Sequence, residues 1–419
     1  MQKIEKIVKR TCLTLIIFML LATFLIEYSF NIGLFPQVII IALNLIAIFV
    51  LGYFYFNPKF VIQKRKEIIL LISVLFIFFV LMETTLQMNY CGWDWDVSIE
   101  EEVKYKYEKS KEICNPVKEL HKKFRVMSNN EGFIDDDFEF NEGDYNIFLI
   151  GDSFAACLES DYENCVHQKL EKDLKKEYSE NINIMNFGVS GYGGAAELAI
   201  LKTYKDEYKP KMIILYFLDN DFSDNENLLH KSYVESKKRR IIRAMTPKTL
   251  LFVMTNGKKI VDKIFIKSEA YRVKTGLEEQ HVKNYEVFLE EYDDKWQNLV
   301  EDELEYLEEI YQISSEENII LLHVAVTSRE QVYEEDWEWL LETYPSLKDN
   351  AYILSKPNEI VMNFAKKNRI HNLDLVPLFK ENPKYLHLPV DGHWNDEGQI
   401  FAGEKIKEYI IENSLIKNV

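Results

Sequence analysis

The last two thirds of the chain alternate between short apolar runs and stretches with helical periodicity. Near-continuous apolar runs are typical of strands that are buried on both faces. Such runs predict five strands, at 145–150, 182–187, 212–217, 319–326 and, more weakly, 370–375. Apolar residues at helical spacing predict helices at 164–178, 195–208, 296–314, 358–367 and 396–412. This alternation predicts an α/β fold, in which a central parallel sheet carries helices on both faces.

The first 89 residues have a different pattern, with three long apolar segments at about 11–30, 36–56 and 67–87. Each is close to the roughly 20 residues that cross a bilayer core. We therefore predict an α-helical transmembrane region of three helices that contact the lipid bilayer. A buried helix bundle in a soluble protein is the alternative, but helices of that kind usually keep a polar face. No small-residue cleavage site follows the first segment, so a cleaved signal peptide is not expected.

Loop charges predict how these helices are oriented. Basic residues precede the first segment and separate the second from the third, at Lys3, Lys6, Lys9, Arg10, Lys59, Lys64, Arg65 and Lys66. The loop between the first two segments has no Lys or Arg, and the stretch after the third is acidic. Because basic loops stay in the cytoplasm, we predict a multi-pass protein of the cell membrane. Its N-terminus is cytoplasmic and its residues 90–419 are extracytoplasmic.

Charge and cysteine content narrow the function. The 419 residues carry a net charge of −18, which argues against a nucleic acid partner because phosphate binding needs a basic surface. Four of the five cysteines lie on the predicted outer side, which permits two disulfides, Cys157 with Cys165 and Cys91 with Cys114. Four free thiols are the alternative. A zinc site is not expected, since the sequence has no CxxC pair and no His at finger spacing.

Two stretches interrupt the strand–helix pattern. Residues 90–140 are polar and acidic, and we interpret them as a linker and entry segment before a domain at 141–419. An insertion at about 222–295 is longer than one crossover helix requires. Its part 231–267 interleaves Lys and Arg with apolar residues, which suits an anionic membrane surface or a lid over a site. Ordinary amphipathic helices that pack on the sheet with a solvated basic face are the slightly favoured explanation.

Candidate catalytic residues lie at the ends of the predicted strands. Ser153 follows the first strand in NIFLIGDSFAAC, and glycines 188, 191, 193 and 194 follow the second. Asn220 follows the third strand, and Asp391 and His393 precede the last helix. Each could be an ordinary turn, packing or loop residue. Together they supply a nucleophile, a base with its orienting carboxylate and oxyanion donors, at the edge where parallel sheets place active sites.

These blocks resemble the SGNH hydrolases, also called GDSL esterases and lipases. The matching residues are Ser153 in IGDSF, Gly191 in VSGYGG, Asn220 in LDND, and Asp391 and His393 in DGHWN. The resemblance covers about 141–411 and implies a flavodoxin-like, three-layer domain. MSNNEGFIDDDF, ahead of the first strand, also resembles the entry segment of membrane-anchored members. Two features depart from the usual pattern, Leu218-Asp219 in place of glycines and the single residue between Asp391 and His393. That short spacing resembles acetyltransferase-like members that act on exopolysaccharides.

The resemblance implies a mechanism without metal or cofactor. Ser153 would attack an ester carbonyl, His393 would act as the general base, and Asp391 would orient the imidazole. The N–H groups of Ser153 and Gly191 and the Asn220 amide would form the oxyanion hole. The function expected is an extracytoplasmic serine esterase or O-acyltransferase acting on acylated glycans. The alternatives are a lipase or lysophospholipase at the membrane surface, and a non-catalytic, membrane-bound assembly or binding protein. The sequence names no protein partner.

Overall fold

The computed structural model describes residues 2–29, 48–70, 97–98, 105–117, 119–230 and 282–416, with a few isolated positions between 73 and 80. The chain divides into two compact units. The described residues up to position 80 belong to the first unit. Those from position 97 onward belong to the second, which contains every predicted site residue.

The described residues of the first unit form helices, α1 (Gln2–Ser29), a helix at 48–56, α3 (Pro58–Gln63) and a helix at 65–70. Within the described part of the chain, no helix combines the length and apolar character that a membrane span needs. Residues 36–47 of the second predicted span and most of the third lie outside the described residues, as do the side chains of residues 18–29. Membrane anchoring therefore stays a prediction.

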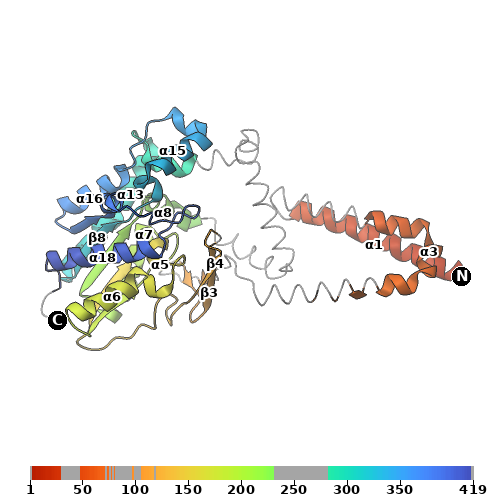
Figure 1. The fold of residues 1–419 in the computed structure, drawn as a ribbon, viewed down its shortest axis with the longest axis horizontal. Coiled ribbons are helices and arrows are strands. Elements are labelled where there is room, and N and C mark those ends of the chain that lie inside the picture. The colour runs from red at the N-terminus through yellow and green to blue at the C-terminus, as the bar shows by residue number, and fades with distance from the viewer. Residues whose placement is uncertain are drawn as a thin grey trace. The chain divides into compact units, whose positions relative to one another are not determined.

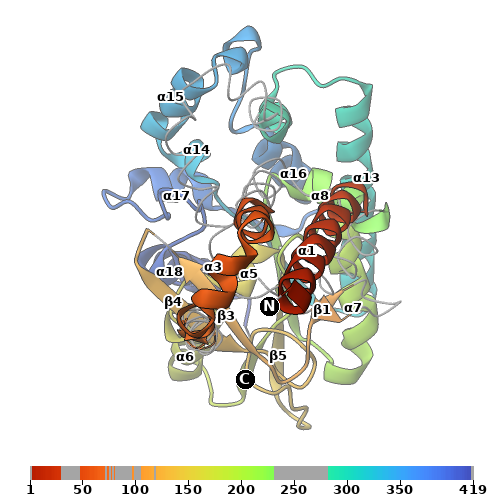
Figure 2. The ribbon, with the colours of Figure 1, turned by 90° about the vertical axis from the view of Figure 1, so that its right-hand side faces the viewer.

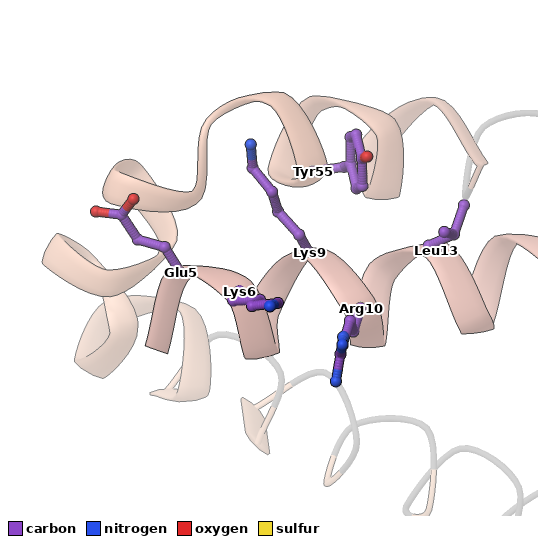
Figure 3. A pocket seen from close by; sticks show the side chains of 6 residues that line it. All are labelled: Glu5, Lys6, Lys9, Arg10, Leu13 and Tyr55. Carbon is purple, nitrogen blue, oxygen red and sulfur yellow. The ribbon is translucent and has the colours of Figure 1, made fainter. Parts of the chain in front are cut away.

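A hollow of about 380 Å³ lies beside the N-terminal part of α1. Figure 3 shows Glu5, Lys6, Lys9 and Arg10 along α1, with Tyr55 on the facing helix. The Lys9 Nζ atom lies 5.6 Å from the centre of the Tyr55 ring. Three of the lining side chains are cations, so this surface of the first unit is positively charged.

The second unit is built on a five-stranded sheet in the order β6-β5-β7-β8-β9, with all neighbouring strands parallel. The strands are β5 (Tyr145–Ile150), β6 (Ile182–Asn186), β7 (Met212–Phe217), β8 (Ile320–Ala325) and β9 (His371–Asp374). All five match predicted strands, and the predicted α/β class with a central parallel sheet is confirmed. Counted within the sheet, the order is 2-1-3-4-5, which reverses between β5 and β7. Ligands of such sheets bind at the reversal.

Helices cover both faces of this sheet. The side chains of Phe148 and Ile150 enter the core beneath α7 (Gly194–Tyr208), α13 (Asp294–Glu316) and α16 (Lys356–Lys367). Those of Ile147 and Leu149 enter the core beneath α6 (Val166–Glu177), α17 (Leu375–Glu381) and α18 (Asp396–Glu412). Figures 1 and 2 show α6 and α18 on one side of the sheet and α7 and α13 on the other. The alternation along β5 thus fills two cores, as a three-layer α/β domain requires.

Shorter elements connect these layers. They are α5 (Ser153–Ala156), η1 (Tyr162–Asn164), α8 (Asp221–His230), η2 (Glu286–Phe288), α14 (Arg329–Val332), α15 (Glu334–Thr343) and η3 (Pro345–Asp349). The basic stretch 231–267 of the predicted insertion lies outside the described residues.

The segment ahead of the sheet is more ordered than its polar composition predicts. β1 (Val97–Ser98) pairs with β2 (Lys106–Tyr107), and β3 (Glu112–Val117) forms an antiparallel hairpin with β4 (Lys122–Met127). Asp135, in the following stretch, is buried and accepts hydrogen bonds from the Asn186 backbone, the Tyr162 hydroxyl and Gln168. The entry segment is therefore attached to the sheet edge and is part of the folded domain.

Candidate active site

Ser153 is the first residue of α5, immediately beyond the carboxyl end of β5. Asp152 caps this short helix, because its side chain accepts a hydrogen bond from the Phe154 N–H at 2.9 Å. The other Asp152 oxygen accepts from the Ser153 hydroxyl at 3.2 Å. The turn thus presents the serine at the sheet edge, next to the reversal in strand order.

His393 and Asp391 lie on the loop before α18 and meet Ser153 directly. The His393 Nε2 atom is 2.8 Å from Ser153 Oγ, and its Nδ1 atom is hydrogen bonded to Asp391. The loop is fixed by backbone hydrogen bonds, from Leu388 N to His393 O and from Gly392 N to Leu388 O. Hydroxyl, imidazole and carboxylate therefore form one chain of hydrogen bonds, the arrangement of a serine nucleophile with its base and orienting acid.

A buried network holds the His393 loop from behind. Trp394 is fully buried, and its indole N–H donates to Thr327 Oγ1 at 2.9 Å. His387 Nε2 lies 3.0 Å from that same hydroxyl oxygen, and burial lowers the pKa of His387 to about 3. His387 is thus a neutral, structural histidine, whereas His393 is the one that faces the serine.

The protonation of His393 is set by opposing effects. Burial lowers its pKa, but the charges of Glu159, Asp391 and Asp152 and the hydrogen bond with Asp391 raise it to about 9. For Asp391, burial raises the pKa, but the hydrogen bond and charge of His393 outweigh burial and leave it below its usual value. The pair therefore favours an imidazolium beside a carboxylate, which is the charge state that forms when a serine is deprotonated.

Glu159 is a second carboxylate beside His393 that the sequence analysis did not single out. It is 4 % exposed and accepts a hydrogen bond at 2.9 Å from Asn115, a buried residue of β3. Burial raises the pKa of Glu159 to about 7. No motif marks this residue, because its place beside the histidine depends on the hairpin and on the distant His393 loop.

Glu159, Asp391 and His393 are also the side chains best placed to hold a cation. One ligand atom from each lies within 4.8 Å of the others. Both nitrogens of His393 are already engaged by Ser153 and Asp391, however, and a metal ion on either would displace one of those hydrogen bonds. We therefore interpret the group as acid–base machinery and derive no metal chemistry from it.

The glycine-rich loop after β6 passes close to the serine turn. A Cβ atom on Gly188 would lie 2.4 Å from the Ala156 nitrogen, so only glycine fits there. Gly191 has φ of +77°, the left-handed region that glycine adopts at least cost. Of the four predicted glycines, Gly193 and Gly194 serve other contacts, and the Gly194 N–H donates to Glu303 at 3.1 Å. Gly191 remains the candidate oxyanion donor of this loop.

Asn220 lies just beyond β7, on the other side of the serine turn. Its side-chain amide donates to Asp224 at 2.9 Å, and its backbone oxygen accepts from the Asp224 N–H. One of the two amide hydrogens is thus used to orient the group, and the second can serve an oxyanion. Hydrogen bonds join Ser153, His393 and Asp391 directly, while Gly191 and Asn220 occupy the neighbouring loops.

A second set of buried carboxylates lies beyond these loops, at Glu197, Asp221 and Glu303. Burial raises the pKa of Glu303 to about 7, and burial together with the neighbouring acids raises those of Glu197 and Asp221. Glu303 accepts from the Gly194 N–H and the Asn225 amide, so it ties α13 to the start of α7. We call these three residues the acid trio.

A disulfide joins Cys157 and Cys165, as the sequence permits, and closes the loop that carries Glu159. Cys114 on β3 is also disulfide-bonded, and its predicted partner Cys91 lies outside the described residues. The segment with Cys114 and the loop between Cys157 and Cys165 contact each other through Asn115 and Glu159, next to His393. The covalent links therefore act near the site.

The chain is similar to several solved structures, but only at low sequence identity. No protein-family model matches the chain, and the search of curated proteins found no significant match. One similar structure is a lipase/acylhydrolase from Enterococcus faecalis, at 14 % identity over 64 % of this chain and 96 % of that one, with a TM-score of 0.37. Another is the psychrotrophic esterase EstA from Pseudoalteromonas sp., at 12 % identity over 65 % and 100 %, with a TM-score of 0.36.

A third similar structure is an acetyl xylan esterase, at 12 % identity over 63 % of this chain and 99 % of that one, with a TM-score of 0.36. All three structures bear the names of ester hydrolases. Their identities and TM-scores are too low to assign this chain to a family. The function is therefore argued from the geometry of the site.

Proposed function

We propose that the protein is a serine esterase or O-acyltransferase of the SGNH type. The observation that carries the proposal is the continuous hydrogen-bonded path from Ser153 Oγ through His393 to Asp391. A serine hydroxyl is a weak nucleophile until a base accepts its proton, and this path supplies the base and its orienting acid. The sequence motifs around all three residues support the same chemistry.

The mechanism follows from these positions. Ser153 Oγ attacks the ester carbonyl while His393 Nε2 takes its proton, and the carbonyl electrons move to the oxygen. The N–H groups of Ser153 and Gly191 and the Asn220 amide stabilise that oxyanion. When the tetrahedral intermediate collapses, the ester bond breaks and the alcohol departs with the proton from His393. The acyl group stays on Ser153. Water then releases the acyl group as an acid, or a sugar hydroxyl accepts it as a new ester.

The substrate we propose is an acylated glycan at the cell surface, with the second unit outside a membrane that the N-terminal helices enter. The single residue between Asp391 and His393 supports a glycan substrate, because this spacing resembles acetyltransferase-like SGNH proteins that act on exopolysaccharides. The apolar N-terminal segments and their basic flanks support a location outside the membrane. A lipase that hydrolyses lipid esters at the same surface is the second candidate, favoured by the apolar and basic residues in 231–267.

The test is hydrolysis of p-nitrophenyl acetate and longer-chain esters by the full-length chain in detergent. We expect turnover that Ser153→Ala abolishes and that Ser179→Ala leaves unchanged. Ser179 is a suitable control because, among the residues that the structure describes, its hydroxyl contacts only the Asn181 N–H, from which it accepts a hydrogen bond in a surface turn. A preference for acetate supports the glycan esterase, and a preference for long chains supports the lipase.

Acceptor glycans separate hydrolysis from transfer. Acyl groups recovered on added oligosaccharide, detected by mass spectrometry, identify a transferase. If neither esters nor acylated oligosaccharides react, the serine mechanism is refuted and a binding or assembly role takes its place.

A further inference from the structure

The entry segment contacts the loop of the candidate oxyanion hole through two tyrosines that the mechanism above does not use. The Tyr105 hydroxyl donates to the Ser190 carbonyl oxygen at 2.6 Å. The Tyr107 hydroxyl accepts from the Ser190 N–H at 3.3 Å and lies 3.2 Å from the Ser190 hydroxyl. These two side chains, which we call the tyrosine clamp, therefore engage the N–H, the carbonyl and the hydroxyl of Ser190.

Ser190 immediately precedes Gly191, and the two residues share one peptide unit. A trans peptide is planar, with its C=O and N–H pointing in opposite directions. Fixing the Ser190 oxygen therefore also fixes the direction of the Gly191 N–H. Gly191 cannot fix the direction of its own N–H, because it has no side chain to anchor it. Its φ of +77° is a conformation that glycine adopts at least cost.

The clamp is itself held in place by contacts of the entry segment with Tyr192 and Tyr204. The Tyr192 hydroxyl donates to the Tyr105 carbonyl oxygen, and the rings of these tyrosines pack edge to face with centroids 5.4 Å apart. Lys106, between the two clamp residues, is 1 % exposed and donates to the Tyr204 hydroxyl on α7 at 2.8 Å. A Cβ atom on Gly191 would lie 3.0 Å from the Tyr105 hydroxyl, which shows how closely the clamp approaches the loop.

We propose that Tyr105 and Tyr107 are positioning residues that aim the Gly191 N–H at the oxyanion, so that the entry segment completes the active site. The proposal rests on the proposed serine mechanism. It makes catalysis depend on residues 105–107, which in sequence come after the apolar N-terminal region and before the first strand of the sheet. The same segment also contacts the rest of the site, because the Asn115 amide donates to Glu159 and Glu119 accepts from the Asp391 N–H.

The test compares Tyr105→Phe, Tyr107→Phe and the double variant with the wild type in ester hydrolysis. Removing an oxyanion donor outright lowers kcat by about 10²- to 10³-fold. Loosening one should cost less, so we expect kcat to fall about tenfold in Tyr105→Phe with KM within about twofold of wild type. The matched control is Tyr292→Phe, which removes a tyrosine hydroxyl bonded to the Val287 carbonyl far along the chain.

A double-mutant cycle tests whether the clamp acts through Gly191. If it does, Tyr105→Phe should cost little further kcat when added to Gly191→Ala, because the donor is already misplaced. The proposal is overturned if the loss of kcat in the double variant equals the product of the losses in the two single variants. A wild-type kcat in Tyr105→Phe also overturns it. A change confined to KM also overturns it, because an oxyanion donor acts in the transition state.

Hydrogen exchange gives a readout that does not depend on activity. We expect the peptide containing Val189–Tyr192 to exchange faster in Tyr105→Phe and Tyr107→Phe than in wild type and Tyr292→Phe. Unchanged protection overturns the clamp, whatever the kinetics show. If the wild type hydrolyses no ester, the serine mechanism fails in that assay, while the exchange experiment still decides whether the tyrosines position the loop.

Discussion

Two groups of buried or half-buried carboxyls lie near the same edge of the sheet and differ in what faces them. Asp391 and Glu159 face the imidazole of His393, and the pKa of Asp391 lies below its usual value, whereas burial raises the pKa of the more deeply buried Glu159 to about 7. The acid trio faces other acids. Burial raises the pKa values of all three, and the neighbouring acids raise those of Glu197 and Asp221 further. Both Glu197 oxygens lack a hydrogen-bond partner within the described part of the chain.

The comparison shows that the neighbour and the depth of burial together decide the charge of a carboxyl, because Glu159 and Glu303 both have pKa values raised to about 7 by burial and only Asp391, less buried and hydrogen bonded to His393, has a lowered one. Beside a base that becomes a cation, the charged form is stabilised and can take part in proton transfer. In a buried position beside other carboxyls, the neutral form is favoured, as the raised pKa values of the acid trio indicate. Substitutions in the two groups should therefore change different properties, activity in the first and pH-dependent stability in the second.

The largest effect on activity is expected from Asp391→Asn. The amide cannot stabilise the imidazolium or hold the reactive tautomer, so kcat should fall by about a thousandfold or more. The paired variant in the other group, Glu197→Gln, should keep kcat within about twofold in the same p-nitrophenyl acetate assay. Equal losses in both variants would show that the two groups are not functionally distinct.

A smaller effect is expected from Glu159→Gln, and it should appear in the pH profile. The base works only when neutral, so kcat/KM should rise with pH to a midpoint near the His393 pKa of about 9. Removing the negative charge of Glu159 destabilises the imidazolium, so the midpoint should move to lower pH, by about one unit.

The profile is measured between pH 5 and 10 after subtraction of spontaneous hydrolysis. Glu163→Gln is the matched control, because Glu163 is exposed in the same disulfide loop. An unshifted midpoint in Glu159→Gln would mean that Glu159 does not act on the histidine.

The third effect concerns stability and leaves activity unchanged. Glu197 has a pKa raised well above its usual value by burial and then by Glu303. The stability that its neutral form gives is complete below pH about 4.5 and is lost as the pH rises through the raised pKa. Glu197→Gln, which is neutral at every pH, should therefore raise the free energy of unfolding at pH 8 by on the order of 1 to 3 kcal/mol.

The same variant should gain little at pH 5, where Glu197 is already protonated. Thermal unfolding of the full-length chain at both pH values measures the difference, with the exposed Glu338→Gln as control. A gain of equal size at both pH values would contradict a protonation effect.

The sequence alone determined the five strands of the sheet and identified the three residues of the proposed triad. The runs that form β5, β7 and β8 are nearly continuous in apolar residues, and this local property persists in the fold. Ser153, His393 and Asp391 could be found because each follows a strand or precedes a helix, and parallel strands bring such positions to one edge. That argument needs only the order of elements along the chain.

The entry segment shows where local patterns fail. Its strands β3 and β4 bury only alternate residues, and β3 contains Asn115 and Pro116, which weaken a strand pattern. The pairing of two polar strands and their attachment to the sheet are set by tertiary contacts. The sequence predicted a linker and entry segment here but did not predict the hairpin that β3 and β4 form.

The tertiary structure also decided which further residues belong to the site. Glu159 reaches His393, and Tyr105 and Tyr107 reach Ser190, across long separations in sequence. No spacing rule predicts such contacts, because they depend on how the loops and the entry segment pack around the sheet edge. The same holds for Gly193 and Gly194, which belong to a catalytic-looking motif but contact the acid trio. Local sequence specifies the elements, whereas the neighbours that set pKa values and loop geometry are specified only by packing.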